Sequence, residues 1–337
     1  MSPDKTSRRS VLAAGGLVAS IGIVAGTSSF EFLSDDGTPG ALGFTAGTAP
    51  IGSDPLVLVN TDEIRENNAA KRVTSTLFAA SQFNDVPTAL TGIFSTNSSS
   101  QVDMKRVGKL VLVGSNLSDN SGGAIVWADW NDDDVVSVLK QTDEAQVRTE
   151  SYGDQTLYTS GATSAAVLSD IAFAFGTTKV VRTIVDIWHG DRAPVGGETL
   201  DSFERTPLRA TVRFSFDTLG VPCNDVSSSN VYDNVTQIYG SVPSDENAVR
   251  LHLRVKSNDV RRKVATAAMD DLETASVESE QNQSNTGGAK LPYDAVENIS
   301  VDDKHDTVTL TYRPDNKDDE YVRALVETLV CLVGRSQ

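Results

Sequence analysis

The chain has 337 residues and a formal net charge of −17, because 46 acidic residues stand against 29 basic ones. Such a surface repels polyanions, so the composition argues against a nucleic-acid partner. With 39% apolar residues, a chain of this length can bury one large core or two ordinary ones, which excludes disorder of the whole.

The choice of charged residues is also biased. Asp outnumbers Glu by 32 to 14, and Arg outnumbers Lys by 18 to 11. In molar salt charges are screened over about 3 Å, so their repulsion costs little while their hydration keeps the protein soluble. We interpret the acidic surface as a sign of a halophilic habitat rather than of a cationic partner.

Residues 1–29 predict a twin-arginine export signal. Arg8 and Arg9 stand in the frame Ser-Arg-Arg-x-x-Leu, which Leu12 completes, directly before a weakly apolar stretch. We therefore expect the twin-arginine export machinery as a partner and an extracellular or cell-surface location. The alternative is an uncleaved signal that anchors the protein, although the apolar run 11–24 is shorter than the ~20 residues of a spanning helix.

The rest of the chain predicts two lobes. Residues 30–53 are rich in Gly and Thr and predict a flexible tether. From residue 54 onward strand-like and helix-like windows alternate, which indicates an α+β fold. A polar stretch with Gly, Pro and Ser at 218–233 predicts a linker between a first lobe at 54–217 and a second lobe at 234–337.

In the first lobe, the patterns predict a strand, a weak helix, a hairpin and a capped helix, and then three strands, a helix and a strand. The predicted ranges are 55–59, 61–83, 104–115 with 124–130, a helix after 131–134, then 147–152, 155–159, 165–175, a helix ending at 188, and 208–216.

In the second lobe, the predicted order is ββαββα. The ranges are 235–242, 248–255, 258–277, 296–301, 307–312 and 318–333. We expect repeated strand-strand-helix units that form two α/β sandwich lobes, with mainly antiparallel sheets and helices on one face.

Several segments of the first lobe resemble a family of uncharacterised haloarchaeal exported proteins with a twin-arginine signal. The resemblance covers mainly residues 54–217 and depends on Tyr-Gly-Asp-Gln-Thr-Leu-Tyr at 152–158, Ala-Ala-Val-Leu at 165–168, the helix-bearing segment 175–191 and the unit 126–139. It implies the habitat and the layout, and it assigns no catalytic residue.

One acidic cluster resembles the start of a calcium loop. Asp129, Asn131 and Asp133 have the spacing of the first three ligands, but Asp134 stands where the loop needs Gly and Lys140 where it needs Glu. The better interpretation is a polar cap before a helix. The alternative is a weak cation site.

A second cluster surrounds a histidine. Asp186, His189 and Asp191 lie at the end of a predicted helix and have residue types that bind metals or relay protons. Their spacing matches no known ligand motif, and a histidine at a helix C-terminus more often lies at the surface. We expect no cofactor.

The cysteines and glycosylation frames leave alternatives open. Cys223 and Cys331 form a disulfide in an oxidising exterior, or they are two buried small hydrophobic residues. Of five Asn-x-Ser/Thr frames, those at Asn97 and Asn282 fall in polar loops where a glycan would be accessible.

No nucleophile elbow, phosphate loop, dinucleotide fingerprint or Cys-x-x-Cys pair follows the signal. The sequence therefore favours a non-catalytic binding or structural module of the cell envelope or the extracellular space. The alternative is a secreted carboxylate-based hydrolase, which needs two converging carboxylates in a cleft between the lobes.

Overall fold

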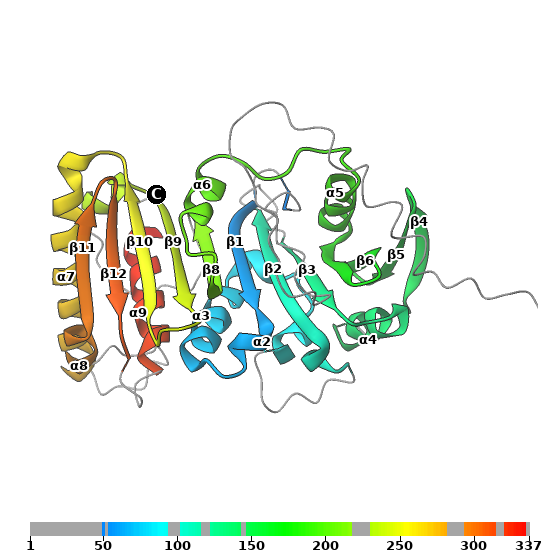
Figure 1. The fold of residues 1–337 in the computed structure, drawn as a ribbon, viewed down its shortest axis with the longest axis horizontal. Coiled ribbons are helices and arrows are strands. Elements are labelled where there is room, and N and C mark those ends of the chain that lie inside the picture. Colours follow the sequence, from blue (N-terminus) through cyan, green and yellow to red (C-terminus); the bar gives the residue numbers. More distant parts are fainter. Residues whose placement is uncertain are drawn as a thin grey trace, which may run out of the picture. The chain divides into compact units, whose positions relative to one another are not determined.

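Twelve strands of the described residues pair into one antiparallel sheet (Figure 1). The computed structural model describes residues 49–50, 53–93, 102–115, 122–142, 146–217, 230–281, 293–314 and 320–334. The sheet order is β11-β12-β10-β9-β8-β1-β2-β3-β7-β6-β5-β4. The strands are β1 (Ser53–Asn60), β2 (Val107–Ser115), β3 (Gly123–Ala128), β4 (Arg148–Tyr152), β5 (Gln155–Ser160), β6 (Thr163–Ser169), β7 (Ala172–Thr177), β8 (Ala210–Phe216), β9 (Val235–Pro243), β10 (Val249–Val255), β11 (Ile299–Lys304) and β12 (Thr307–Tyr312).

Helices pack on both faces of this sheet. One face carries α3, α4, α7, α8 and α9, and the other carries α5 and α6 (Figure 1). The α-helices are α2 (Thr61–Ile64), α3 (Asn68–Phe78), α4 (Asp132–Thr142), α5 (Thr178–Trp188), α6 (Glu198–Glu204), α7 (Asn258–Gln281), α8 (Tyr293–Glu297) and α9 (Glu320–Gly334). Short 3₁₀ turns are η3 (Ser81–Phe83), η4 (Thr88–Ile93), η5 (Met104–Arg106) and η6 (Asn230–Asn234).

The central strand β1 explains why both faces need cover. Leu56 and Leu58 pack in the core beneath α5 and α6, whereas Val57 and Val59 pack in the core on the opposite side. Successive side chains of a strand point to opposite faces, so a strand with an unbroken apolar run must be covered on both faces of the sheet. The expectation of helices on one face only is therefore wrong for this half of the sheet.

The part of the sheet formed by β10, β11 and β12 behaves differently. In β10 the side chains alternate strictly, with Leu251 and Leu253 buried in the helical core and His252 and Arg254 on the other face. Of the residues that the structure describes, no helix covers that second face over β10, β11 and β12 (Figure 1). Here the helices lie on one face, as the sequence predicts.

The expected division into two lobes with separate sheets is not confirmed. The strands that flank the expected linker, β8 and β9, are direct neighbours, with Val212 opposite Val242 and Phe214 opposite Gly240. Residues 218–229 lie outside the described part of the chain. The α+β class and the antiparallel pairing are confirmed, and so is the ββαββα order after residue 234 apart from the additional short helix α8, whereas a repeat of strand-strand-helix units is not.

Three local differences from the sequence prediction matter. The run 165–175 contains two strands, β6 and β7, because the turn formers Ser169 and Asp170 interrupt it. The helix α6 stands where no element is expected. Ala49, at the end of the expected tether, is buried and accepts a hydrogen bond from the N–H of Val195 (2.7 Å), so these described residues belong to the fold.

Among the described helices, none combines the length and the apolar character that crossing a membrane requires.

Candidate functional site

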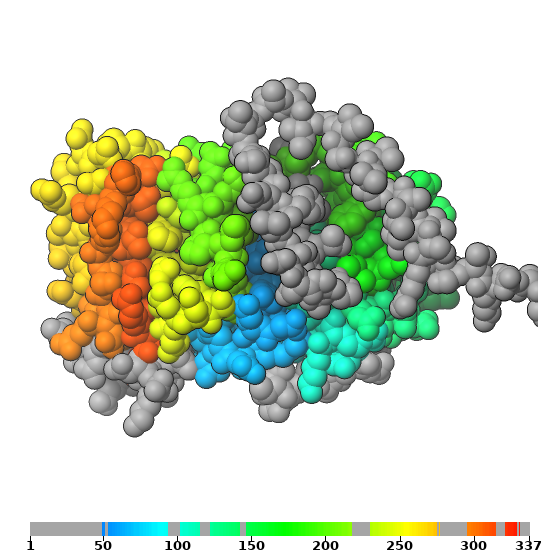
Figure 2. Space-filling model, viewed as in Figure 1, coloured from blue at the N-terminus to red at the C-terminus, as the bar shows by residue number. Residues whose placement is uncertain are grey.

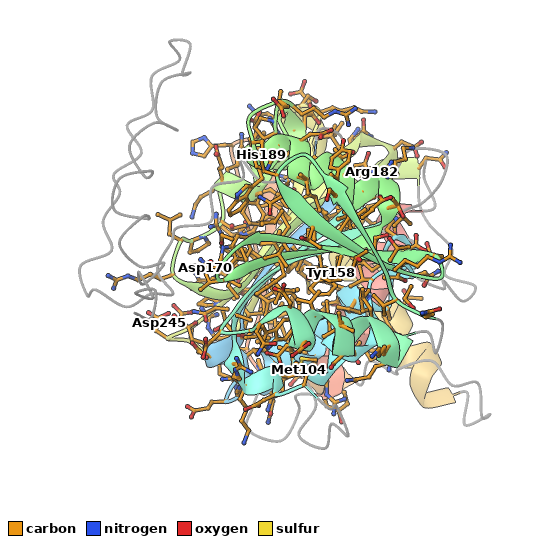
Figure 3. The ribbon with its side chains drawn as sticks, turned by 90° about the vertical axis from the view of Figure 1, so that its right-hand side faces the viewer. Met104, Tyr158, Asp170, Arg182, His189 and Asp245 are labelled. Atoms are coloured by element: carbon orange, nitrogen blue, oxygen red, sulfur yellow. The ribbon has the colours of Figure 1, made fainter. Side chains whose placement is uncertain are left out.

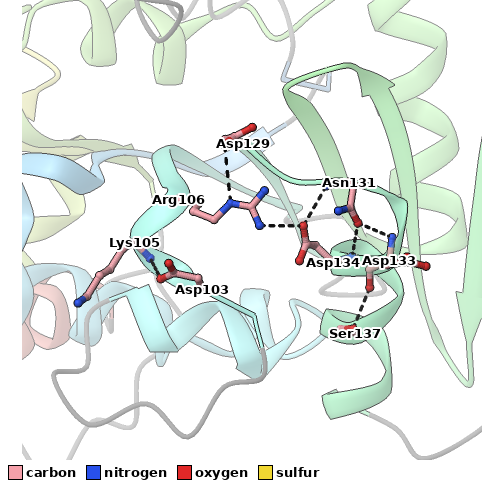
Figure 4. A network of polar contacts seen from close by, with 8 residues as sticks. All are labelled: Asp103, Lys105, Arg106, Asp129, Asn131, Asp133, Asp134 and Ser137. Atoms are coloured by element: carbon pink, nitrogen blue, oxygen red, sulfur yellow. Dashed lines mark hydrogen bonds and ion pairs between the residues drawn. The ribbon is translucent and has the colours of Figure 1, made fainter.

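The residues that resemble a calcium loop form the start of α4 (Figure 4). The Oδ1 of Asn131 accepts hydrogen bonds from the N–H groups of Asp133 (2.9 Å) and Asp134 (3.1 Å), and the Oδ2 of Asp134 accepts one from the N–H of Asn131 (3.0 Å). This reciprocal pattern satisfies backbone donors that the first helical turn leaves open. The helix-cap interpretation is confirmed.

The acidic side chains at the start of α4 have partners in neighbouring elements. The guanidinium of Arg106 lies 3.1 Å from Asp134 and 3.8 Å from Asp129 (Figure 4). The hydroxyl of Tyr158 donates to Asp132 (3.0 Å). Burial, and secondly this bond, raises the pKa of Tyr158 to about 12, so it stays a donor. The cluster thus ties α4 to η5 and β5.

The residues around His189 link α5 to the hairpin β4–β5. Asp186 accepts a hydrogen bond from the hydroxyl of Tyr152 (2.8 Å) and lies 3.8 Å from the guanidinium of Arg192. His189 is exposed at the helix end, and its Nε2 lies 3.3 Å from the Nε2 of Gln155. The bond to Asp186 raises the pKa of Tyr152.

The guanidinium of Arg182 adds a further contact between α5 and the hairpin β4–β5. Arg182 pairs with Glu150 (2.6 Å) and lies over the ring of Tyr152 (5.1 Å to the centroid), on the same side of the sheet as His189 (Figure 3). Asp191 is exposed. Within the described residues no group of three or more His, Cys, Asp or Glu side chains is placed to hold a metal ion. The structure therefore does not bring Asp186, His189 and Asp191 together as ligands.

Several residues that the sequence singles out lie outside the described part of the chain. These are the signal residues Arg8, Arg9 and Leu12, the glycosylation frames at Asn97 and Asn282, and Cys223. Cys331 belongs to α9, but its side chain is not described. The disulfide stays a prediction.

An open groove of about 360 Å³ lies between α7 and the edge strand β11, which border one another in Figures 1 and 2. Its apolar floor consists of Ala265, Met269 and Val301, three partly buried side chains that pack against the core. The positions 265 and 269 are one helical turn apart and so lie on the same face of α7. This β11 groove is a shallow surface with an apolar floor and polar walls, and it lies beside a strand that ends the sheet formed by the described residues.

Charged side chains lie around the floor of the β11 groove. Arg262 and Asp270 line it from α7, and Asp303 lines it from β11. Asp303 pairs with the guanidinium of Arg261 (3.4 Å), which also donates to the carbonyl oxygen of His305. For Arg262 and Asp270 no ion pair occurs among the described residues.

The charges on the polar face of the neighbouring strands have partners, unlike Arg262 and Asp270 in the groove, for which no ion pair occurs among the described residues. Asp306 accepts two hydrogen bonds from Arg205 (2.9 and 3.1 Å) and lies 3.5 Å from Arg254. The Arg205 guanidinium lowers the pKa of Asp306. Lys304 pairs with Asp302 (2.5 Å) in the same way. These charges are satisfied within the fold, which leaves the β11 groove as the better binding surface.

The sequence predicts both walls of the β11 groove but not the groove. A helix at 258–277 and a strand at 296–301 are expected, in fair agreement with α7 and β11. That β11 ends the sheet, and that α7 packs beside it, depends on the strand order, which a local pattern does not contain. The only local signal is the run Asp302, Asp303 and Lys304, since edge strands often carry charges.

No protein-family model matches the chain, and no curated protein matches it. Among solved structures it is similar to crystal forms I, III and IV of a protein named TP0453, with 9%, 8% and 10% sequence identity and TM-scores of 0.45, 0.45 and 0.44. The alignments cover 84% of this chain and 96% to 97% of those chains. With TM-scores below 0.5, these similarities carry no argument about the site or its function.

Proposed function

We propose that the chain is an exported binding module of a halophile's cell envelope, without catalytic activity, and that the β11 groove is its binding site. The frame around Arg8 and Arg9 supports export, and the excess of Asp and Arg supports a high-salt exterior. An uncleaved apolar segment at 11–24 would hold the same module at the membrane surface.

The observation that carries the proposal is the position of the groove at an end of the sheet. Ala265 and Met269 of α7 and Val301 of β11 are half-buried apolar side chains, and among the described strands β11 pairs on one side only. Concave apolar surfaces with a few polar groups at the rim are the usual form of binding sites. The caps and ion pairs around Asn131 and His189 have structural partners instead.

The binding site is tested by filling the groove. Thr266 is exposed and lines the groove, so Thr266→Trp blocks it with little effect on the core. Lys263 is exposed on the same helix and does not line the groove, which makes Lys263→Trp the matched control. We expect the full chain and the control to co-sediment with washed envelopes in high salt, and Thr266→Trp to lose this. Equal sedimentation of all three would contradict the proposed site.

Export is tested separately by intact mass. We expect the protein in the supernatant or on the cell surface of a high-salt host, without the first 29 or so residues, and an Arg8→Lys, Arg9→Lys variant to stay inside the cell. An uncut mass confined to membranes would instead establish the segment 11–24 as an anchor. Cytoplasmic wild-type protein would exclude the proposed location.

A further inference from the structure

We infer that the β11 groove binds an extended peptide segment of another protein, which adds a strand to the sheet and places an acidic, an apolar and a basic side chain along the groove in that order. This inference rests on the proposed binding function and names the ligand class. It is inferred from the position of β11 at the end of the described sheet, from the spacing of two charges and from the direction of the two groove walls.

The strand edge supplies the backbone contacts. Among the described strands, β11 is terminal in the sheet order and pairs with β12 only. In an antiparallel pair, alternate N–H and C=O groups of each strand point away from the partner, so the outer edge of β11 is a template for a further strand. Bound segments of this kind gain affinity from the backbone and specificity from alternate side chains in adjoining pockets.

The groove supplies the side-chain contacts at the right spacing. Arg262 and Asp270 are eight residues apart on α7, a distance of about 12 Å along the axis. In an extended segment, residues i and i+4 are about 13 Å apart and point to the same side. One residue therefore meets Arg262, another meets Asp270, and the residue between them rests on Ala265 and Val301 near the middle of the groove.

The contacts of Arg261 fix the relative direction of α7 and β11, and this sets the charge order of a segment that pairs antiparallel with β11. The ion pair of Arg261 with Asp303, and its bond to the carbonyl oxygen of His305, place the start of α7 beside the end of β11. The two groove walls thus run in opposite directions. A segment that is antiparallel to β11 runs along α7 from Arg262 towards Asp270, so its acidic residue precedes its basic one.

A second copy of β11 does not fit this edge. The strand Ile299–Lys304 contains no acidic residue four positions before a basic one, so a second copy of β11 cannot place opposite charges at both Arg262 and Asp270. The occupant is therefore a segment with a different charge order.

The direct test measures binding of synthetic peptides to the full chain by fluorescence anisotropy in high salt. The probe is labelled Ser-Glu-Thr-Val-Thr-Lys-Ser, and the control exchanges its Glu and Lys. We expect the probe to bind at least about tenfold more tightly than the control, a difference of about 1.4 kcal/mol. N-methylation at one set of alternate peptide nitrogens should abolish binding, while methylation at the other set should not, because only one set faces β11.

The charge order is tested by a swap in the protein. Arg262 and Asp270 are both exposed, so a double Arg262→Asp, Asp270→Arg variant keeps the core intact. We expect it to prefer the exchanged peptide by a similar factor, and Thr266→Trp to bind neither peptide while Lys263→Trp binds as wild type does. No binding of either peptide, or an unchanged preference in the swapped protein, would overturn the inference. Envelope binding that Thr266→Trp abolishes would still support the proposed function in that case.

Discussion

His252 occupies the middle of the open polar face and is held in its neutral form. Its ring stacks on Tyr239, with centroids 4.6 Å apart and planes at 17°, and its Nδ1 lies 2.9 Å from the hydroxyl of Thr309. Burial, and to a lesser degree the charge of Arg250, lowers the pKa of His252 to about 4. The unfolded chain binds this proton near pH 6.5, and the folded chain only near pH 4.

This difference predicts a contribution of His252 to acid denaturation. Between pH 6.5 and 4 the unfolded state holds one proton more, so the free energy of unfolding falls by up to about 1.4 kcal/mol per pH unit as the pH decreases. His252→Gln replaces the titratable imidazole with an amide, which takes up no proton in this pH range and still forms hydrogen bonds. We expect the free energy of unfolding, measured by denaturant titration, to fall by about 2 kcal/mol less in the variant than in the wild type between pH 7.5 and pH 4.5. Equal losses would contradict the neutral state of His252.

Gly240 is a residue at which a single methyl group should have a large effect. A Cβ at this position would lie 2.4 Å from the carbonyl oxygen of Arg250 and 2.5 Å from the ring of Phe214, so neighbouring strands must move apart. We expect Gly240→Ala to lower the free energy of unfolding by about 3 kcal/mol. Gly196→Ala is the control, because nothing lies within 4 Å of its Cβ. Similar melting temperatures for both variants would show that the strands at Gly240 are less closely packed.

At the scale of elements, substitutions at the start of α4 test whether these residues form a helix cap or a cation site. Asn131→Ala removes the acceptor of two backbone N–H groups, and we expect a loss of about 1 kcal/mol. Asp129→Asn should have almost no effect, since its side chain is 95% exposed. Differential scanning calorimetry checks both variants.

Because the cap needs no ion, the melting temperature of the wild type should be equal within about 1 °C in EDTA and in millimolar calcium. A clear increase with calcium would support the alternative.

The elements that the sequence predicts well are those with a local signal. The alternation in β10 and the helical spacing in α5 are visible in the sequence, and the cap of α4 follows from Asn131. The helix α6 has only seven residues and follows a glycine with φ of 76°, so its pattern is too short to recognise. The length of a signal thus decides what can be predicted.

The candidate site could not be predicted for a different reason. Val301 and Met269 are 32 positions apart in the chain, and their contact with one groove depends on which strand ends the sheet. The clusters that the sequence does indicate, around Asn131 and His189, gather polar residues because helix ends need partners. Polar clusters close in sequence therefore indicated helix ends, whereas the groove arises from the tertiary arrangement.

At the scale of the whole molecule, the sheet joins the two halves that the sequence separates. The pairing of β8 with β9 is accompanied by packing between α3 and α9, which belong to different halves. One continuous apolar core, on the face of the sheet that carries α3 and α9, includes Val73 of α3 and Leu325 of α9. A defect in either half should therefore destabilise both.

The three tryptophans make this cooperativity measurable, because Trp127, Trp130 and Trp188 all lie in the first half. Leu310 lies in the second half, on β12, and is 1% exposed. We expect Leu310→Ala to lower the free energy of unfolding by about 3 kcal/mol. If the sheet unfolds as one unit, the transition measured by tryptophan fluorescence shifts by the same amount as the transition measured by far-ultraviolet circular dichroism. If the halves were independent lobes, the fluorescence transition would stay at its wild-type midpoint while part of the dichroism signal moved, because the cavity at Leu310 would then affect only strands that no tryptophan reports.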